Sequence, residues 1–262
     1  MPSQPLVIGH RGASAIAPEN TLAAFKRAID AGADGVEFDV RLSSDGVPVI
    51  IHDETLQRTG SLKRRVRDLS AAELQQVNVG SWFSRERRTT KEFADEKVPT
   101  LQQLFDLFAS NRALLYLEMK CSPEERAQLA AACCYLVTVA SLRERVVFEC
   151  FDLAALEAVK GIDPGMRTAA LFEPKLTSPS SLLLSQRLVD RAKAVGAEEI
   201  ALHHALASTR LIDRANLAGL KIVVWTVDDP AWIQRAQLQG IDALISNDPA
   251  TMLRQRDTLP LV

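Results

Sequence analysis

The 262-residue sequence contains no run of about 18 or more uncharged apolar residues, so it predicts no transmembrane helix. It also has little net charge, because 31 Lys and Arg residues are balanced by 33 Asp and Glu residues, for a formal charge of -2. No overall basic field exists to attract nucleic acid or an anionic membrane surface. We therefore expect a small-molecule substrate held by local charges, no nucleic-acid partner and no stable membrane anchor, with the oligomeric state left open.

Cysteine is scarce, and its four residues lack the C-x-x-C spacing of many zinc sites and redox motifs. They are Cys121, Cys133, Cys134 and Cys150. An adjacent pair is also a poor start for a disulfide framework, so we expect reduced core residues. Only four residues separate Met1 from the first apolar run, without the basic segment and longer hydrophobic stretch of a signal peptide. Cytoplasmic residence is the expected location.

Apolar residues make up 47% of the chain, which is enough for one large core. Nine short apolar runs without alternation recur, as is typical of strands buried on both faces of a parallel sheet. They are Leu6–Gly9, Val36–Val40, Val47–Ile51, Leu114–Glu118, Val146–Cys150, Thr168–Phe172, Ile200–His203, Ile222–Val227 and Ala243–Ser246. Helical patterns separate most of them, at Asn20–Ala31, Leu101–Ala109, Pro123–Ala140, Leu153–Val159, Leu182–Val195, Thr209–Ala218 and Ala231–Gln239. This alternation predicts an α/β protein, a (β/α)8 TIM barrel that forms a single domain over residues 1–262.

The second and third runs break this alternation, because Arg41–Gly46 is too short for a crossover helix. We therefore expect a hairpin. A two-residue turn centred on Asp45-Gly46 places Asp39 directly opposite His52. Glu37 shares the face of Asp39, since side chains repeat every two residues along a strand. Residues 54–98 are polar and interrupt the strand-helix rhythm, which predicts a small insertion over the barrel mouth.

The first run ends in His10-Arg11-Gly12, at the face of the barrel where active sites assemble. The imidazole can act as an acid or base, and the guanidinium offers a fork for a phosphate oxygen. A structural histidine with a capping arginine would leave the same pattern, because most buried polar groups are simply satisfied ones.

Two carboxylates, Glu37 and Asp39, share one strand face and should repel each other strongly at low dielectric. A bound divalent ion would resolve this conflict, and all-oxygen ligation favours Mg²⁺ or Ca²⁺ over zinc. The alternative is ion pairing of the two carboxylates with Arg11, Arg41 or Lys120.

The fourth run closes with Glu118-Met119-Lys120, and the same two-residue period sends Glu118 and Lys120 to one face. Glu118 could complete a site with three carboxylates, and Lys120 could add positive charge for a phosphate. Taken alone, the pair would be an ordinary salt bridge at a strand end.

Five motifs in order resemble those of the glycerophosphodiester phosphodiesterase family. They are His10-Arg11-Gly12, Pro18-Glu19-Asn20-Thr21, Glu37-x-Asp39-Val40, Asp45-Gly46 with His52-Asp53, and Glu118-x-Lys120. The resemblance continues through Val98-Pro99-Thr100-Leu101 and Trp225-Thr226-Val227-Asp228, so it spans nearly the whole chain. The fold that it implies, a (β/α)8 barrel, agrees with the alternation of strands and helices.

Carried over residue by residue, the resemblance implies a role for each motif residue. His10 and His52 would form the catalytic acid/base pair, Glu37, Asp39 and Glu118 would bind one divalent cation, Mg²⁺ or Ca²⁺, and Arg11, Lys120 and Trp225 would contact the substrate. The implied reaction is hydrolysis of a glycerophosphodiester to sn-glycerol 3-phosphate and an alcohol. The segment 245–249 departs from the Thr-Asp of many relatives, and we expect no consequence because it should touch no catalytic group.

Two other functions remain open. A lysophospholipid substrate on the same barrel would need an apolar groove for an acyl chain, and the lack of an amphipathic membrane anchor argues against it. A non-catalytic metal-binding or phosphate-binding barrel would be expected to lose an acid/base histidine, yet both His10 and His52 are present. His203 and His204 form a second pair at a strand end, and the two-residue period lets only one of them face the mouth.

Overall fold

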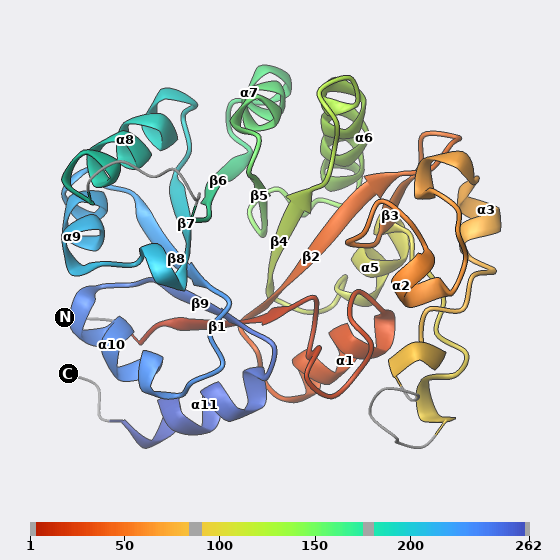
Figure 1. The fold of residues 1–262 in the computed structure, drawn as a ribbon, viewed down its shortest axis with the longest axis horizontal. Coiled ribbons are helices and arrows are strands. Elements are labelled where there is room, and N and C mark those ends of the chain that lie inside the picture. The colour runs from red at the N-terminus through yellow and green to blue at the C-terminus, as the bar shows by residue number, and fades with distance from the viewer. Residues whose placement is uncertain (1–3, 84–90, 175–180, 260–262) are drawn as a thin grey trace.

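A computed structural model describes residues 4–83, 91–174 and 181–259. Eight parallel strands close into a barrel with helices outside it (Figure 1). In ring order the strands are β1 (Leu6–His10), β9 (Ala243–Ser246), β8 (Lys221–Trp225), β7 (Glu199–His203), β6 (Arg167–Phe172), β5 (Val146–Cys150), β4 (Leu114–Met119) and β2 (Gly35–Leu42). Pairing of β1 with β2 closes the ring. The predicted (β/α)8 barrel is confirmed.

Strand alternation divides the interior into two layers. On β2, Val36, Phe38 and Val40 join the large core between the strands and the helices. The alternate positions on the strands face the lumen, where Ile8, Val147 and other apolar side chains form a separate cluster. Glu37 and Asp39 of β2 therefore face the lumen near the carboxyl ends of the strands.

Helices follow most strands, and several of them begin at side-chain caps. They are α1 (Leu22–Asp30), α5 (Leu101–Leu107), α6 (Arg126–Val139), α7 (Leu153–Ile162), α8 (Ser181–Ala194), α9 (Thr209–Leu217), α10 (Ala231–Gln239) and α11 (Pro249–Thr258). The first seven confirm the predicted helices to within a few residues. The sequence analysis missed α11, although Asp248 accepts a hydrogen bond from the backbone N–H of Thr251 and Pro249 occupies the first turn, which is a typical helix start.

The hairpin is present but its predicted register is wrong by one residue. The strand β3 (Pro48–Ile50) pairs antiparallel with β2, with Val40 opposite Ile50. A three-residue loop replaces the expected two-residue turn, because Gly46 adopts a left-handed conformation with φ 77° and its N–H bonds the carbonyl of Ser43. The backbone N–H of Ile51, not of His52, therefore bonds the carbonyl of Asp39.

The predicted insertion follows β3 and lies beside β2 and β3 (Figure 1). Its short elements are α2 (Gln57–Gly60), η1 (Val66–Asp68), α3 (Ala71–Leu74) and η2 (Lys91–Phe93). A small apolar core that includes Leu56, Val66 and Leu74 holds it together. Residues 84–90 of this segment lie outside the described residues. Within the described ranges, no helix has both the length and the apolar character that crossing a bilayer requires.

Candidate active site at the barrel mouth

Three buried carboxylates gather at one point of the lumen. Asp39 of β2 and Glu118 of β4 are register partners on neighbouring parallel strands. Oxygen atoms of Glu37, Asp39 and Glu118 all lie within 4.8 Å of one another. The structure thus brings together the three acidic residues that the sequence proposed as metal ligands.

This crowding perturbs each acid differently. Burial, with the charges of Asp39 and Glu118, raises the pKa of Glu37 well above its usual value. Burial and the charge of Asp39 raise the pKa of Glu118 to about 7. Burial would also raise the pKa of Asp39, but the cations Arg11 and Lys120 outweigh it and hold that pKa below its usual range. The three groups can all be ionised at neutral pH only if further positive charge is supplied.

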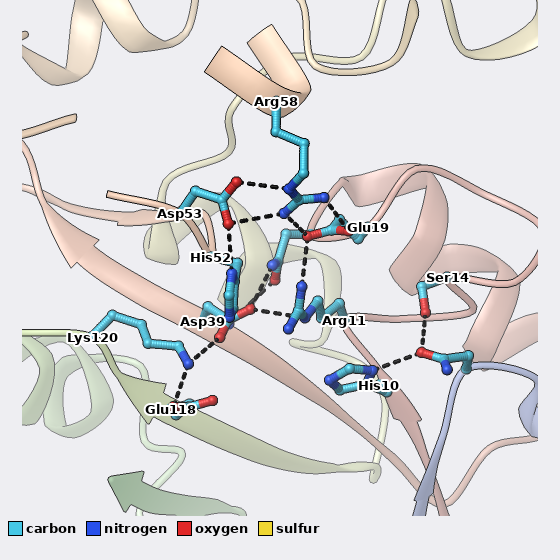
Figure 2. Close-up of polar contacts among 12 residues, drawn as sticks. His10, Arg11, Ser14, Glu19, Asp39, His52, Asp53, Arg58, Glu118 and Lys120 are labelled. Carbon is cyan, nitrogen blue, oxygen red and sulfur yellow. Dashed lines mark hydrogen bonds and ion pairs between the residues drawn. The ribbon is translucent and has the colours of Figure 1, made fainter. Parts of the chain in front are cut away.

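Two cations supply part of that charge. The Nζ atom of Lys120 lies 2.5 Å from Oε1 of Glu118 and 3.2 Å from Oδ1 of Asp39, and Figure 2 shows it between the two carboxylates. The Nε atom of Arg11 lies 3.3 Å from Oδ2 of Asp39. Arg41 does not join them, because its guanidinium donates to the backbone carbonyls of His52 and Lys120.

The remaining oxygens fit a hard divalent cation. Oε1 of Glu37 is buried and has no hydrogen-bond partner among the described residues. Oδ1 of Asp39 and Oε1 of Glu118 are buried, and among the described cations the ammonium of Lys120 pairs with both of them. Buried carboxylate oxygens gathered from two neighbouring strands are the ligands that Mg²⁺ and Ca²⁺ prefer.

His10 is oriented by a residue that the sequence analysis dismissed. Its Nδ1 lies 2.7 Å from Oδ1 of Asn247, just after β9. The expectation that segment 245–249 touches no proposed catalytic group is therefore wrong. The amide N–H₂ of Asn247 donates to Asp228 at 2.7 Å, and Oδ1 also accepts from Ser14 at 2.8 Å.

These bonds fix the protonation of the imidazole. Because an amide oxygen only accepts hydrogen bonds, Nδ1 of His10 must carry the hydrogen, which leaves Nε2 as a proton acceptor. Burial, helped by the charge of Arg11, lowers the pKa of His10 to about 4, so the ring is neutral at neutral pH. Its Nε2 lies 3.8 Å from Oε2 of Glu37.

His52 is oriented in a similar way from the insertion side. Its Nδ1 lies 2.7 Å from Oδ1 of Asp53, and Nε of Arg58 donates to Oδ2 of that carboxylate at 2.7 Å. The same guanidinium donates twice to Glu19, which accepts from Arg11 at 2.7 Å. Figure 2 shows Arg58 bridging Asp53 and Glu19, so a single side chain of α2 links the supports of His52 and Arg11.

A cavity of about 340 Å³ opens beside the carboxylates and contains most of the predicted site. Its lining includes the predicted His10, Arg11, Glu37, His52, Glu118, Lys120 and Trp225, together with Glu149, Phe151, Leu171, Glu173 and Ile245. The sequence analysis missed Glu149 and Phe151 of the β5 end. A glutamate inside the apolar run Val146–Cys150 was the available signal.

The second histidine pair lies apart from this cavity. The ring of His203 is 5.1 Å from the ring of Trp225, and its Nδ1 accepts from the backbone N–H of Ala205. His204 is exposed, with Nδ1 near the carbonyl of Thr226. Neither histidine is among the described residues that line the cavity, although the ring of His203 contacts the Trp225 side of its wall.

The sequence matches a model of the glycerophosphoryl diester phosphodiesterase family over residues 10–251. The chain belongs to this family. A glycerophosphodiester phosphodiesterase of Caldanaerobacter subterraneus is 32% identical over 95% of this chain and 96% of the relative. The fold is also similar to solved phosphodiesterase structures. One is the structure of an Oleispira antarctica phosphodiesterase in complex with the product sn-glycerol-3-phosphate. It superposes with a TM-score of 0.85 and 28% sequence identity, and the match covers 97% of this chain and 98% of the other. The structure of a glycerophosphodiester phosphodiesterase from Agrobacterium tumefaciens superposes with a TM-score of 0.78 and 27% sequence identity, and the match covers 95% of this chain and 99% of the other.

Proposed function

We propose that this phosphodiesterase-family protein hydrolyses glycerophosphodiesters to sn-glycerol 3-phosphate and an alcohol with the help of one divalent cation, Mg²⁺ or Ca²⁺. The observation that carries the proposal is the cluster of Glu37, Asp39 and Glu118, with unsatisfied oxygens, in a cavity also lined by two imidazoles. The names of the relatives and the product bound in the Oleispira antarctica structure support the substrate class.

Binding of the phosphodiester would use the cations of the cluster. A cation held by the three carboxylates would withdraw negative charge from the phosphate oxygens. Arg11 and Lys120 line the same cavity and carry N–H donors suited to those oxygens. Glu19 and Asp39 hold the Arg11 guanidinium in place before substrate arrives, which lowers the cost of ordering it.

Proton transfer would be shared between His10 and His52. Each ring is held at Nδ1, by Asn247 and by Asp53, which leaves Nε2 of each for the substrate. One neutral imidazole would remove the proton of the attacking hydroxyl through Nε2, and the other, entering as an imidazolium, would donate its Nε2 proton to the oxygen of the leaving alcohol. Each such role contributes about 10²–10⁴-fold to the rate.

A second cavity supports a polar leaving alcohol over an acyl chain. It measures about 370 Å³ and shares Glu118, Lys120 and Phe151 with the first. Five of the other eleven residues in its lining are charged, namely Arg41, Glu54, Arg67, Glu125 and Asp152. An acyl chain would desolvate these groups without pairing them, which disfavours a lysophospholipid substrate.

The test is a coupled assay for sn-glycerol 3-phosphate released from glycerophosphocholine. Wild type should be active with Mg²⁺ or Ca²⁺ and lose that activity in chelator, and His10→Ala and His52→Ala should each lose roughly 10²–10⁴-fold in kcat. His204→Ala is the matched control, because this exposed histidine is not among the residues lining the cavity. Full activity of His10→Ala, or activity insensitive to chelator, would contradict the proposal.

Cation binding can be tested without turnover. Glu37→Gln keeps the size of the side chain but replaces a carboxylate oxygen of the cluster by an amide, so calorimetry should show weaker Mg²⁺ or Ca²⁺ binding with little change in thermal unfolding. An unchanged affinity would remove Glu37 from the proposed ligands.

A further inference from the structure

The lumen contains two further buried glutamates, and their surroundings differ. Glu199, at the start of β7, accepts a hydrogen bond from the hydroxyl of Tyr116 at 2.9 Å and pairs with Arg167 at 2.7 Å. Glu149, near the mouth end of β5, is only 1% exposed, and its Oε2 has no hydrogen-bond partner among the described residues. Neighbours within the barrel therefore satisfy the carboxylate of Glu199, whereas no described neighbour satisfies Oε2 of Glu149.

An unpaired buried carboxyl oxygen is costly, and proteins retain one chiefly where it binds something else. Glu149 lines the cavity of the proposed active site. It is the register partner of Glu118 on the neighbouring strand, so it adjoins the carboxylate cluster. The oxygens that lie within 4.8 Å of one another belong to Glu37, Asp39 and Glu118 and do not include those of Glu149, so Glu149 lies beside the cluster while lining the cavity.

A donor without a partner lies across the same cavity. Trp225 ends β8 and lines the cavity, and its indole Nε1 is buried with no acceptor among the described residues. The strands β6 and β7 separate β8 from β5 in the ring. Phe151, just after β5, spans this gap, with its ring centroid 5.6 Å from that of Trp225.

We propose that Glu149 and the indole N–H of Trp225 form a hydroxyl-binding subsite for the glycerol arm of the substrate, an assignment that rests on the proposed function. A hydroxyl group both donates and accepts, so it can satisfy the carboxyl oxygen and the indole N–H. The carbon atoms of a glycerol arm would pack against Phe151 and Leu171, which line the same cavity. The subsite would select a hydroxylated arm over an apolar one, because the apolar arm would leave both polar groups unpaired.

Product binding tests this subsite without turnover. Calorimetry would compare sn-glycerol 3-phosphate with propyl phosphate, which lacks both hydroxyls, in the presence of Mg²⁺. Wild type should bind the glycerol compound at least about 10-fold more tightly, and Glu149→Leu should remove most of this preference while changing propyl phosphate binding less than about 3-fold. Glu149→Gln keeps an acceptor and should retain an intermediate preference.

Further variants separate the subsite from a general effect. Trp225→Phe keeps an aromatic wall without the N–H and should also reduce the preference. Tyr116→Phe removes a hydrogen bond to Glu199 in the lumen, outside the cavity, and should leave the preference for the glycerol compound unchanged. Two results would overturn the subsite and place Glu149 with the metal cluster. One is an equal loss of affinity for both phosphate compounds in Glu149→Leu and Glu149→Gln, and the other is a parallel loss of affinity for Mg²⁺ in these variants. An unchanged preference in both Glu149 variants would overturn it as well.

Turnover distinguishes this inference from the proposed function. If wild type prefers sn-glycerol 3-phosphate but does not hydrolyse glycerophosphocholine, the proposed function fails and the subsite stands. If wild type hydrolyses glycerophosphocholine and propyl phosphocholine with equal kcat/KM, the proposed function survives and the subsite fails.

Discussion

The Nδ1 atom of His52 lies 2.7 Å from Oδ1 of Asp53, and Arg58 donates hydrogen bonds to both oxygens of that carboxylate, at 2.7 and 3.1 Å. The carboxylate accepts from Nδ1–H and so holds the ring in the tautomer that presents Nε2. Hydrogen bonds from Arg58 outweigh the effect of burial and lower the pKa of Asp53 to about 2, which keeps the acceptor ionised.

Asp53→Asn should therefore lower kcat by roughly 10²-fold with little loss of stability, because the amide can present its N–H₂ to Nδ1 and favour the wrong tautomer. Steady-state assays and thermal unfolding of the same preparation would check this. Asp163→Asn is the control, since Asp163 pairs with Arg143 on the surface. Wild-type kcat in Asp53→Asn would show that the contact does not orient the catalytic ring.

Asn247 should prove as important to His10 as Asp53 is to His52. Asn247→Ala removes the acceptor at 2.7 Å from Nδ1, so the ring loses its fixed tautomer and kcat should fall by roughly 10- to 100-fold. Asp228→Asn leaves the Asn247 acceptor in place and perturbs its support, together with the bonds that Asp228 accepts from Ser246 and from the backbone N–H of Asn247, so it should cost less. Asn216→Ala, which removes a bond to the carbonyl of Gln239, serves as the control. A larger effect of Asn216→Ala than of Asn247→Ala would contradict this role.

The raised pKa of Glu118 predicts a pH-dependent difference in stability between wild type and Glu118→Gln. In the metal-free protein its pKa is raised from 4.5 to about 7, so folding favours the protonated acid. That stabilisation is fully present below about pH 4.5 and is lost as the pH rises through about 7. Between these pH values, the free energy of unfolding of the variant should therefore rise relative to that of wild type by up to roughly 3 kcal/mol.

Urea unfolding in chelator at pH 4.5 to 8 would measure this difference. Groups remote from Glu118 titrate alike in both proteins and cancel in the comparison, whereas Glu37 and Glu149 titrate differently in the variant because the charge of Glu118 raises their pKa values. Saturating Mg²⁺ should reverse the order at pH 8, because only wild type offers the full set of carboxylates. A difference that does not change with pH would mean that Glu118 is ionised throughout.

Gly12 sets the backbone path that carries Arg11 into the site. Its φ is 84°, and a Cβ atom there would lie 2.5 Å from the carbonyl carbon of Ala24. Gly12→Ala should cost roughly 2–5 kcal/mol of stability, from the left-handed conformation and the overlap together. Gly32→Ala is a matched control, since Gly32 has φ 86° and no atom within 4 Å of the added Cβ, and it should cost only about 1–2 kcal/mol. If thermal unfolding showed an equal loss of stability in both variants, the overlap at Gly12 would be excluded as a cause.

Much of this architecture could be predicted because buried runs and helical periods are local patterns. The three carboxylates could be placed together, since parallel strands present their carboxyl ends at one edge. The hairpin register could not, because Asp45-Gly46 suits both a two-residue turn and the three-residue loop with Gly46 in the left-handed region. Bonds formed in the folded hairpin, such as those of Ser43 with Val47, distinguish the two loops.

Contacts between distant segments could not be predicted from the sequence. Asn247 and His10 are 237 positions apart, and no spacing rule connects them. Arg58 was missed because its partners Glu19 and Asp53 meet only in the folded chain. The assignment of residues 1–262 to one domain and the catalytic roles of individual residues stay predictions.

Closure of the ring by β9 against β1 gives the site a definite place in the order of synthesis. A nascent chain on the ribosome exposes His10 long before Asn247. Partly synthesised or C-terminally truncated chains would therefore carry every proposed cation ligand and both histidines, yet lack the amide that orients one of the two rings.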